Sequence, residues 1–209
     1  MREWVLGWSL CRDAPEPVEE PDGFRIDVGL PGHRVRFVLA GTASVRERAV
    51  ASTEPGTWLK ICGRRADVVP LLGPGWVVGA PEFLMSTTPG DGPAVPAPDG
   101  YRTEVVRERR FHEVVVTAPD GGRAARGRFA VHGGVAVVDQ VVTEPAHRRR
   151  GLGRCVMGTI GAHARDRGAG VAVLVATVEG RHLYESLGWW VDSEVVAAHR
   201  PDPAAPHTA

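Results

Sequence analysis

The sequence predicts a mixed α/β protein, in which helices cover a sheet that has parallel and antiparallel strands. Short β-rich runs recur between turn residues along much of the chain. Residues 171–176 form a nearly continuous apolar run, as expected of a strand buried on both faces. A helical pattern over 151–167 separates that run from the β-rich run before it. Strand, helix and strand of these lengths imply a parallel pair with a right-handed crossover.

Length and composition describe an ordinary globular chain. Its 209 residues suffice for one large domain or two small ones, with 43% hydrophobic and 24% charged residues. The formal net charge is zero, so the basic surface of a dedicated nucleic-acid-binding protein is missing. No apolar stretch reaches the roughly 18 residues that span a bilayer, and no export signal opens the chain. We expect a cytoplasmic protein that binds neither nucleic acid nor membrane.

The cysteines indicate neither a disulfide framework nor a metal site. Cys11, Cys62 and Cys155 are far apart, odd in number and lack the spacing of zinc ligands. This usage fits a reducing compartment. We expect no metal in the site.

The first hundred residues are expected to form an α/β subdomain. Helices are predicted at 2–12, 44–52 and 64–72, and strands at 24–28, 35–40, 58–62 and 76–78. Residues 86–100 hold four prolines and three glycines, which predicts a flexible linker or a surface loop. The subdomain with its linker therefore covers residues 1–100.

Residues 101–199 are expected to form a second domain. Strands are predicted at 103–106 and 112–117, a hairpin at 123–132 and 135–142, and a helix from Gly151 or Leu152 to Arg167 that ends at Gly168. Residues 200–209 contain three prolines and no periodicity, which predicts a flexible tail.

A phosphate-binding loop is predicted where the hairpin ends. The run Val141-Val142-Thr143 breaks at Pro145 and leads into Arg148-Arg149-Arg150-Gly151-Leu152-Gly153, followed by the helix. A helix start carries partial positive charge and free N–H groups, and arginines add charge-assisted contacts to phosphate oxygens. A solvated basic turn is the alternative interpretation.

These residues resemble a known family. Arg148-x-x-Gly151-x-Gly153 after a strand is similar to the Q/R-x-x-G-x-G/A acyl-CoA pyrophosphate loop of the GNAT superfamily of N-acetyltransferases. Residues 123–197 resemble the second half of that family in the order of their elements. The resemblance implies a GNAT-like fold around a strand-helix-strand-helix unit, with acetyl-CoA as co-substrate. The N-terminal element order echoes this unit, so the first half could be a degenerate GNAT-like copy.

The resemblance also implies which groups hold the cofactor. Backbone groups of a strand that splays from its neighbour would hold the pantetheine arm, with the N–H of Val142 as candidate oxyanion donor. Phosphates would meet the loop and the first helical turn. The implied cofactor-binding residues are Val141, Val142, Thr143, Arg148, Arg149, Arg150, Gly151, Leu152, Gly153 and Arg154.

Two side chains are candidates for proton transfer. Tyr184 lies in a segment that resembles N-x-x-A-x-x-x-Y-x-x-x-G-F, and a phenol with pKa of about 10 can donate to a thiolate. Thr177 and Gly180 stand where that pattern has Asn and Ala. Asp139 precedes the loop and is the candidate general base. Packing roles are the alternatives for both residues, and Glu144, His112 and His182 are competing bases.

The function implied is an acetyl-CoA-dependent N-acetyltransferase that acts by direct attack of a primary amine. A small-molecule amine is the expected acceptor. A protein N-terminus or lysine is the alternative acceptor, and a non-catalytic acyl-CoA-binding regulator is the alternative class. A homodimer is compatible with the sequence.

Overall fold

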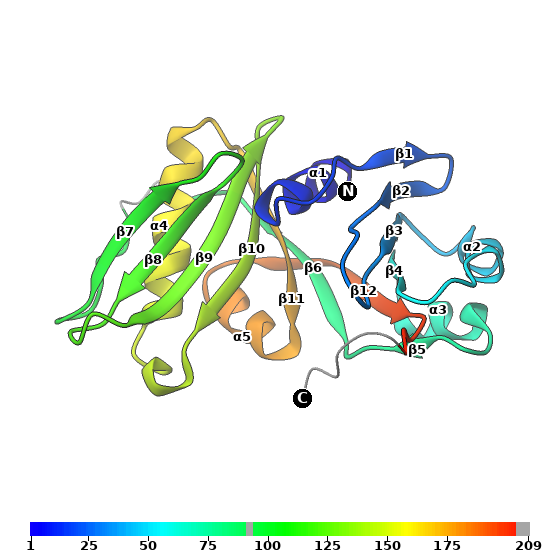
Figure 1. Cartoon of the computed structure of the whole chain (residues 1–209). Coiled ribbons are helices and arrows are strands. Elements are labelled where there is room, and N and C mark those ends of the chain that lie inside the picture. Colours follow the sequence, from blue (N-terminus) through cyan, green and yellow to red (C-terminus); the bar gives the residue numbers. More distant parts are fainter. Residues whose placement is uncertain (91–93, 204–209) are drawn as a thin grey trace.

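The described strands of the chain form one mixed sheet of twelve strands, with helices on both faces (Figure 1). The structure is a computed structural model that describes residues 1–90 and 94–203. Parallel and antiparallel pairs both occur in the sheet. The predicted mixed α/β class is therefore confirmed.

The elements fall into two successive groups along the chain. The first group consists of α1 (Arg2–Cys11), β1 (Val18–Glu20), β2 (Gly23–Ile26), β3 (Val35–Leu39), α2 (Val45–Ala51), β4 (Thr57–Cys62), α3 (Arg65–Leu72), β5 (Val77–Val78) and β6 (Glu82–Thr87). The second group consists of β7 (Arg102–Arg107), β8 (His112–Thr117), β9 (Arg123–His132), β10 (Val135–Thr143), the single turn η1 (Pro145–His147), α4 (Leu152–Asp166), β11 (Val171–Thr177), α5 (Val178–Ser186) and β12 (Trp190–His199).

The sheet consists of two similar halves that exchange a strand. Each half contains one parallel pair with a helical crossover: β3 and β4 joined by α2, and β10 and β11 joined by α4. Strand β6 leaves the first half to pair with β11, whereas β12 leaves the second half to pair with β4. The two exchanged strands also pair with each other at the centre of the sheet (Figure 1). The division near residue 100 stays a prediction.

Most predicted elements occur within a residue or two of the expected bounds, and three strands were not anticipated. These are β1, β6 and β12, which lie where no strand was predicted. The prediction of a linker from Ser86 is wrong for Ser86 and Thr87, because they extend β6 by pairing with β11. Within the predicted linker and tail, residues 91–93 and 204–209 lie outside the described residues. Arg200, where the predicted tail begins, donates to the carbonyls of Ser52 and Pro74.

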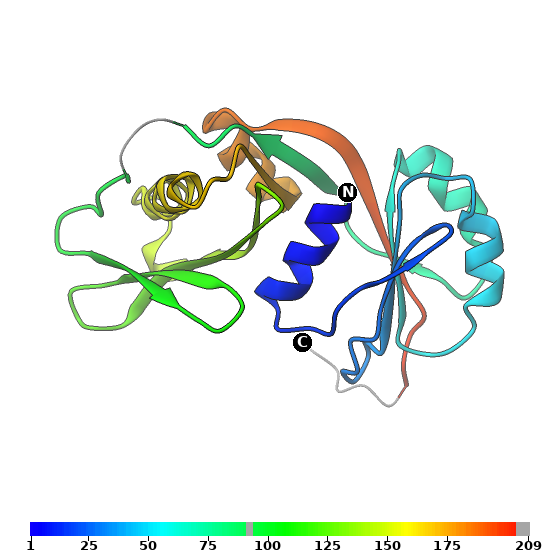
Figure 2. The ribbon, with the colours of Figure 1, turned by 90° about the horizontal axis from the view of Figure 1, so that it is seen from above.

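Helix α1 lies between the two halves on one face of the sheet, in a region that we call the trough (Figure 2). Its residues Trp4, Val5 and Trp8 belong to a buried apolar cluster that includes side chains of both halves. At Gly7 the helix approaches β10 so closely that a Cβ atom would lie 2.2 Å from Cγ2 of Val137. The close approach explains glycine in the middle of this helix.

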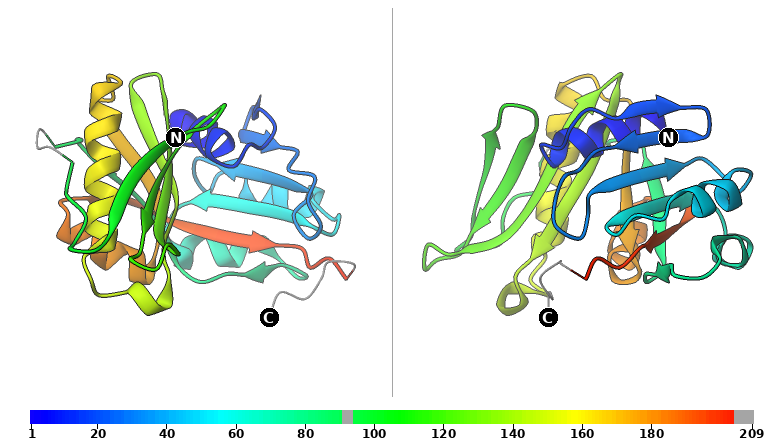
Figure 3. Two further views of the ribbon diagram at one scale, coloured as in Figure 1. Left: turned by 60° about the vertical axis from the view of Figure 1, so that its left-hand side comes forward. Right: turned by 45° about the vertical axis from the view of Figure 1, so that its right-hand side comes forward.

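The other helices cover the opposite face. Helix α4 packs on β8, β9 and β10, and it lies across these strands from α1 (Figure 3). Helices α2 and α3 pack with β3, β4 and β12 in a second core. Within the described ranges, every helix is too short or too polar to cross a bilayer.

Candidate active site

The parallel strands β10 and β11 separate after a short paired stretch. Their register runs from Val135 with Val171 to Val137 with Val173, although β10 continues to Thr143 and β11 to Thr177. Past that point the two strands form a wedge, and β11 keeps its other neighbour, β6, as far as Thr177. In the wedge, therefore, the backbone groups of β10 and β11 form no hydrogen bonds with each other.

A β-bulge re-aims β10 at the start of the wedge. Between Asp139 and Val142, β10 has one more residue than its antiparallel partner β9. Gln140 accommodates the bulge with φ of 53°, in the left-handed region. Val142 beyond the bulge is 39% exposed, whereas Val141 packs against the core. Bulges of this kind often lie beside active sites, because they redirect side chains and interrupt pairing.

The loop after the wedge leads directly into α4. Gly151 is the N-cap of α4 with φ of 80° in the left-handed region, and a Cβ atom there would meet nothing within 4 Å. The N–H groups of the first helical turn have no carbonyl partner within the helix. Leu152 is 1% exposed, so its side chain belongs to the core and only its backbone can serve the loop. Open space at Gly151 and free N–H groups suit binding of a phosphate group.

Four exposed arginines surround this helix start: Arg148, Arg149, Arg150 and Arg154. Among the described residues, none of the four forms an ion pair with a carboxylate. Arg148 donates to the carbonyl of Thr143 at 3.2 Å, and Arg150 donates to the hydroxyl of Tyr101 at 3.2 Å. The loop thus presents uncompensated positive charge at the end of the wedge, which fits a diphosphate group.

Tyr184 lies on α5, the helix that follows β11, and its side chain is 7% exposed. Its ring contacts that of Trp189, with centroids 5.9 Å apart. Burial, reinforced by the negative charge of Asp139, raises the pKa of Tyr184 to about 12. The phenol therefore keeps its proton at neutral pH. No described residue forms a hydrogen bond with its hydroxyl, which leaves this donor available.

Thr177 and Gly180, which differ from the family pattern around Tyr184, each have a local structural role. A Cβ atom at Gly180 would lie 3.2 Å from Cε2 of Tyr184, so glycine lets the ring lie against the start of α5. The Thr177 hydroxyl accepts from the N–H of Gly180 at 3.1 Å and caps the helix. Both residues therefore position Tyr184.

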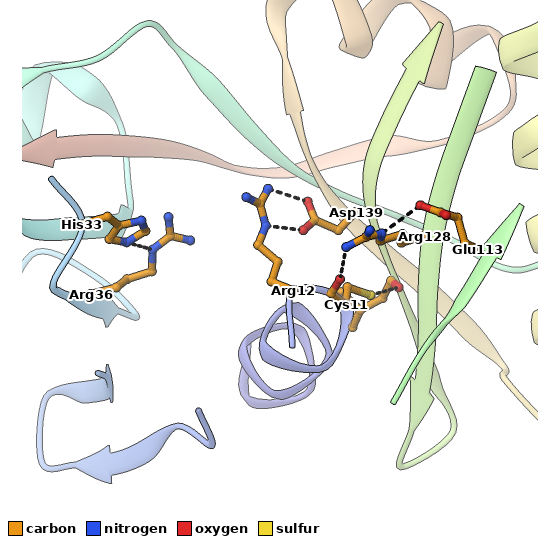
Figure 4. A network of polar contacts seen from close by, with 8 residues as sticks. Cys11, Arg12, His33, Arg36, Glu113, Arg128 and Asp139 are labelled. Atoms are coloured by element: carbon orange, nitrogen blue, oxygen red, sulfur yellow. Dashed lines mark hydrogen bonds and ion pairs between the residues drawn. The ribbon is translucent and has the colours of Figure 1, made fainter. Parts of the chain in front are cut away.

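Asp139 lies at the bulge and is held by Arg12, the C-cap residue of α1. Arg12 donates from Nε to Oδ2 at 2.5 Å and from the terminal nitrogen to Oδ1 at 3.1 Å (Figure 4). The Asp139 side chain is 17% exposed and that of Arg12 is 42% exposed. This bidentate pair fixes the carboxylate beside the wedge, and its negative charge acts on Tyr184.

Two other candidates for the general base, His112 and His182, lie in surroundings different from those of Asp139. His112 stacks on Phe129 within β8 and β9, with ring centroids 5.1 Å apart, and burial lowers its pKa. His182 is exposed on α5. Cys155 is fully buried in the core beside Thr103, as expected of a packing residue. Asp139 lies at the bulge beside the wedge, and its charge reaches Tyr184 on α5.

Comparison with known proteins identifies the C-terminal half. Residues 110–191 match the family model described as an acetyltransferase (GNAT) domain. No curated protein matches the chain. Residues 110–191 therefore form a GNAT acetyltransferase domain, which contains the wedge, the loop of arginines before α4, and Tyr184.

Solved structures show the same fold. A GCN5-related N-acetyltransferase from Kribbella flavida is 20% identical, with a TM-score of 0.66, over 93% of this chain and 92% of that one. A putative GNAT-family acetyltransferase from Novosphingobium aromaticivorans is 20% identical with a TM-score of 0.59, over 96% and 99% of the two chains. A tandem GNAT protein from the clavulanic acid biosynthesis pathway is 12% identical with a TM-score of 0.55, over 77% and 69%.

Sequence reasoning missed two groups of residues, one at the loop before α4 and one on strands β3 and β4. Tyr101 connects the loop, because its hydroxyl forms a hydrogen bond with His147 Nδ1 at 3.0 Å and accepts another from Arg150. Arg36 and Lys60 are buried charges on β3 and β4. Each interrupts an apolar strand, and Lys60 is the sole lysine of the chain, so a search for charges inside apolar strands could have found both.

Proposed function

We propose that the protein is an acetyl-CoA-dependent N-acetyltransferase that acetylates a primary amine of a small molecule. The observation that carries the proposal is the wedge between β10 and β11, which ends at four arginines that pair with no carboxylate of the described residues and is followed by the helix that holds the buried Tyr184. When bound, acetyl-CoA supplies an activated acetyl thioester. The fold supports acyl transfer in general.

Each part of the site would take one task. The backbone of Val141, Val142 and Thr143 would hold the acyl arm, and the N–H of Val142 would stabilise the developing oxyanion. The loop and first turn of α4 would bind the diphosphate through the N–H groups of residues 149–154 and the arginine side chains. Leu152 and Gly153 would contribute backbone only.

The proton transfers would be divided between two residues. As the amine nitrogen bonds to the acyl carbon and the carbon–sulfur bond breaks, nitrogen must lose one proton and sulfur must gain one. Tyr184 would donate to sulfur. Asp139 would accept from nitrogen, using oxygen lone pairs that Arg12 leaves free. The position of α1 in the trough beside Asp139 favours a small acceptor over a protein N-terminus or lysine.

Non-catalytic binding of an acyl-CoA is the second candidate function. The observation that favours it is the bidentate hold of Arg12 on Asp139, which engages both carboxylate oxygens and leaves fewer lone pairs for a proton of the amine. In that case the protein would bind acetyl-CoA and acetylate no amine.

We propose in addition that the N-terminal half is a degenerate GNAT-like copy. The parallel pair β3 and β4 with its crossover helix, and the exchange of β6 for β12, support this interpretation. One structural neighbour is described as a tandem GNAT protein.

Calorimetric titration with acetyl-CoA tests the binding site. Gly151→Trp should abolish binding, because it places a bulky side chain at the mouth of the loop. Gly121→Trp is the matched control: Gly121 also has positive φ and open space around it, but lies in the turn between β8 and β9. No binding by the parent protein would remove both cofactor-dependent functions, and equal loss in both variants would remove the assignment of the site to this loop.

An amine-panel assay with thiol detection separates the enzyme from the regulator. Tyr184→Phe should lower kcat by about 10²-fold or more, the usual contribution of a general acid, while acetyl-CoA binding is retained. An unchanged kcat would exclude Tyr184 as the acid. Acetyl-CoA binding without transfer to any amine would support the regulator.

A further inference from the structure

A group of charged residues lies on the α1 face of the sheet, between the two halves. In β3, Phe37 and Leu39 pack in the core under α2 and α3, so Arg36 points to the opposite face. In β4 the same alternation places Lys60 opposite Leu59 and Ile61. The side chains of this face come from Arg12, Arg36, Lys60, Glu82 and Asp139.

The charges of this group do not balance. Arg12 pairs with Asp139, and Lys60 pairs with Glu82. Among the described residues, Arg36 forms no ion pair, although it is only 8% exposed. Although burial lowers the pKa of Arg36 to about 10, its guanidinium remains charged at neutral pH. A buried cation without a carboxylate partner is unfavourable for stability, so its presence calls for another explanation.

The guanidinium of Arg36 is held in place with most of its donors free. Its Nε donates to Nε2 of His33 at 3.2 Å, and its Cζ atom lies 4.0 Å from the centroid of the Trp8 ring. Its terminal nitrogens have no hydrogen-bond partner in the described part of the chain. Since every fully buried polar side-chain atom there has a partner, these nitrogens reach solvent. Two adjacent donors fixed in one plane match the oxygens of a carboxylate.

The location connects Arg36 to the wedge. Figure 4 shows His33 and Arg36 on one side of the Arg12–Asp139 pair and Arg128 with Glu113 on the other. Asp139 is close enough to raise the pKa of Arg36, and it is also the charge that acts on Tyr184. An anion on Arg36 would therefore lie near the groups that we assign to proton transfer.

We propose that Arg36 binds a carboxylate of the acceptor, so that the acetylated amine belongs to an amino acid or another small amino-carboxylate. The inference rests on the proposed function, because it names the acceptor class of that site. His33 and Trp8 act as positioning residues, since they fix the guanidinium plane. Lys60 and Arg12 add positive potential around the bound carboxylate.

Matched acceptors test this assignment. We would compare glycine, leucine and phenylalanine with their carboxamides, which keep the amine and lose the negative charge. A charge-assisted bidentate contact should make kcat/KM about tenfold or more higher for the carboxylate of each pair. The parent protein alone can overturn the inference, by using amides and free acids equally well.

Variants assign the preference to Arg36. Arg36→Met should reduce the preference to about one while acetyl-CoA binding is unchanged, and it should fold, because an apolar replacement removes a buried charge. Arg25→Met on the neighbouring strand β2 is the control, since the Arg25 side chain is 45% exposed and pairs with Asp27. A preference that survives Arg36→Met, or falls equally in Arg25→Met, contradicts the proposal. If Arg36→Met does not fold, Arg36→Lys, which keeps the charge without the planar fork, should weaken the preference.

Calorimetry keeps the two proposals distinguishable. N-acetylglycine, N-acetylleucine and their amides are titrated into the protein in the presence of coenzyme A. Tighter binding of the carboxylates supports the Arg36 site even when transfer is too slow to measure. Transfer to amines without any carboxylate preference leaves the acetyltransferase function standing and overturns the Arg36 site.

Discussion

The contact between Gly7 of α1 and Val137 of β10 gives a prediction whose sign is opposite to the usual rule. Alanine in place of glycine inside a helix normally stabilises by about 1 kcal/mol. Here the new Cβ would lie 2.2 Å from Cγ2 and 2.4 Å from Cβ of Val137. Normal contact between carbon atoms is about 3.5–4.0 Å, so α1 would have to move by more than about 1 Å.

The displacement should outweigh the gain in helix propensity. Overpacking of a core typically costs about 1–3 kcal/mol. With about 1 kcal/mol returned by propensity, Gly7→Ala should lower the free energy of unfolding by up to about 2 kcal/mol. Because Arg12 directly follows α1 as its C-cap, the same shift should loosen the hold on Asp139.

Urea unfolding of a small set of variants checks this reasoning. Gly161→Ala in α4 is the control, because nothing lies within 4 Å of a Cβ atom there, and it should stabilise by about 1 kcal/mol. In a Val137→Gly background the clash is gone, so adding Gly7→Ala should now stabilise the protein. The reasoning is refuted if Gly7→Ala stabilises the parent as Gly161→Ala does, or if its effect is the same in both backgrounds.

Three further predictions concern packing and titration. Gly127→Ala on β9 would bring a Cβ atom to 2.7 Å from Val156 on α4, and thermal unfolding should show a lower Tm with a loss of about 1–3 kcal/mol. Burial, with the nearby charge of Arg36, lowers the pKa of His33 to about 3, so the unfolded chain takes up this proton first as the pH falls. The stability that neutral His33 contributes is therefore fully present above about pH 6.5. Between about pH 6.5 and 3 it is lost, at up to about 1.4 kcal/mol per pH unit. Urea unfolding against pH should show a smaller loss of stability over this range in His33→Gln. Ultraviolet titration should show a tyrosine ionising near pH 12, and Tyr184→Phe should remove that transition; a transition near pH 12 that persists in the variant would contradict the burial argument.

The sequence was most informative where structure depends on neighbours in the chain. The loop from Arg148 to Gly153 could be recognised because turn, charge and helix start are consecutive, and the structure has Gly151 as the cap of α4. The helix at Arg2–Cys11 was equally readable from the spacing of its apolar residues.

The sequence did not predict which distant segments pair with each other. The apolar runs of β6 and β12 would suit a neighbour in their own half as well as one in the other half, and nothing local specifies the exchange. Asp139 could be proposed from its position before the loop, but Arg12, its partner, is 127 residues away. The burial of Arg36 could not be predicted for the same reason, because it depends on contact between α1 and β3 across the trough.

The exchanged strands impose an order on folding during synthesis. Strand β4 lies early in the chain, yet its antiparallel partner β12 is Trp190–His199, near the end of the chain. Until that strand leaves the ribosome, the N-terminal half keeps an open sheet edge of apolar residues, which is a known risk for association with other chains. Neither half can close its own sheet, so the halves are expected to become stable together, when the last strand of one is inserted into the other.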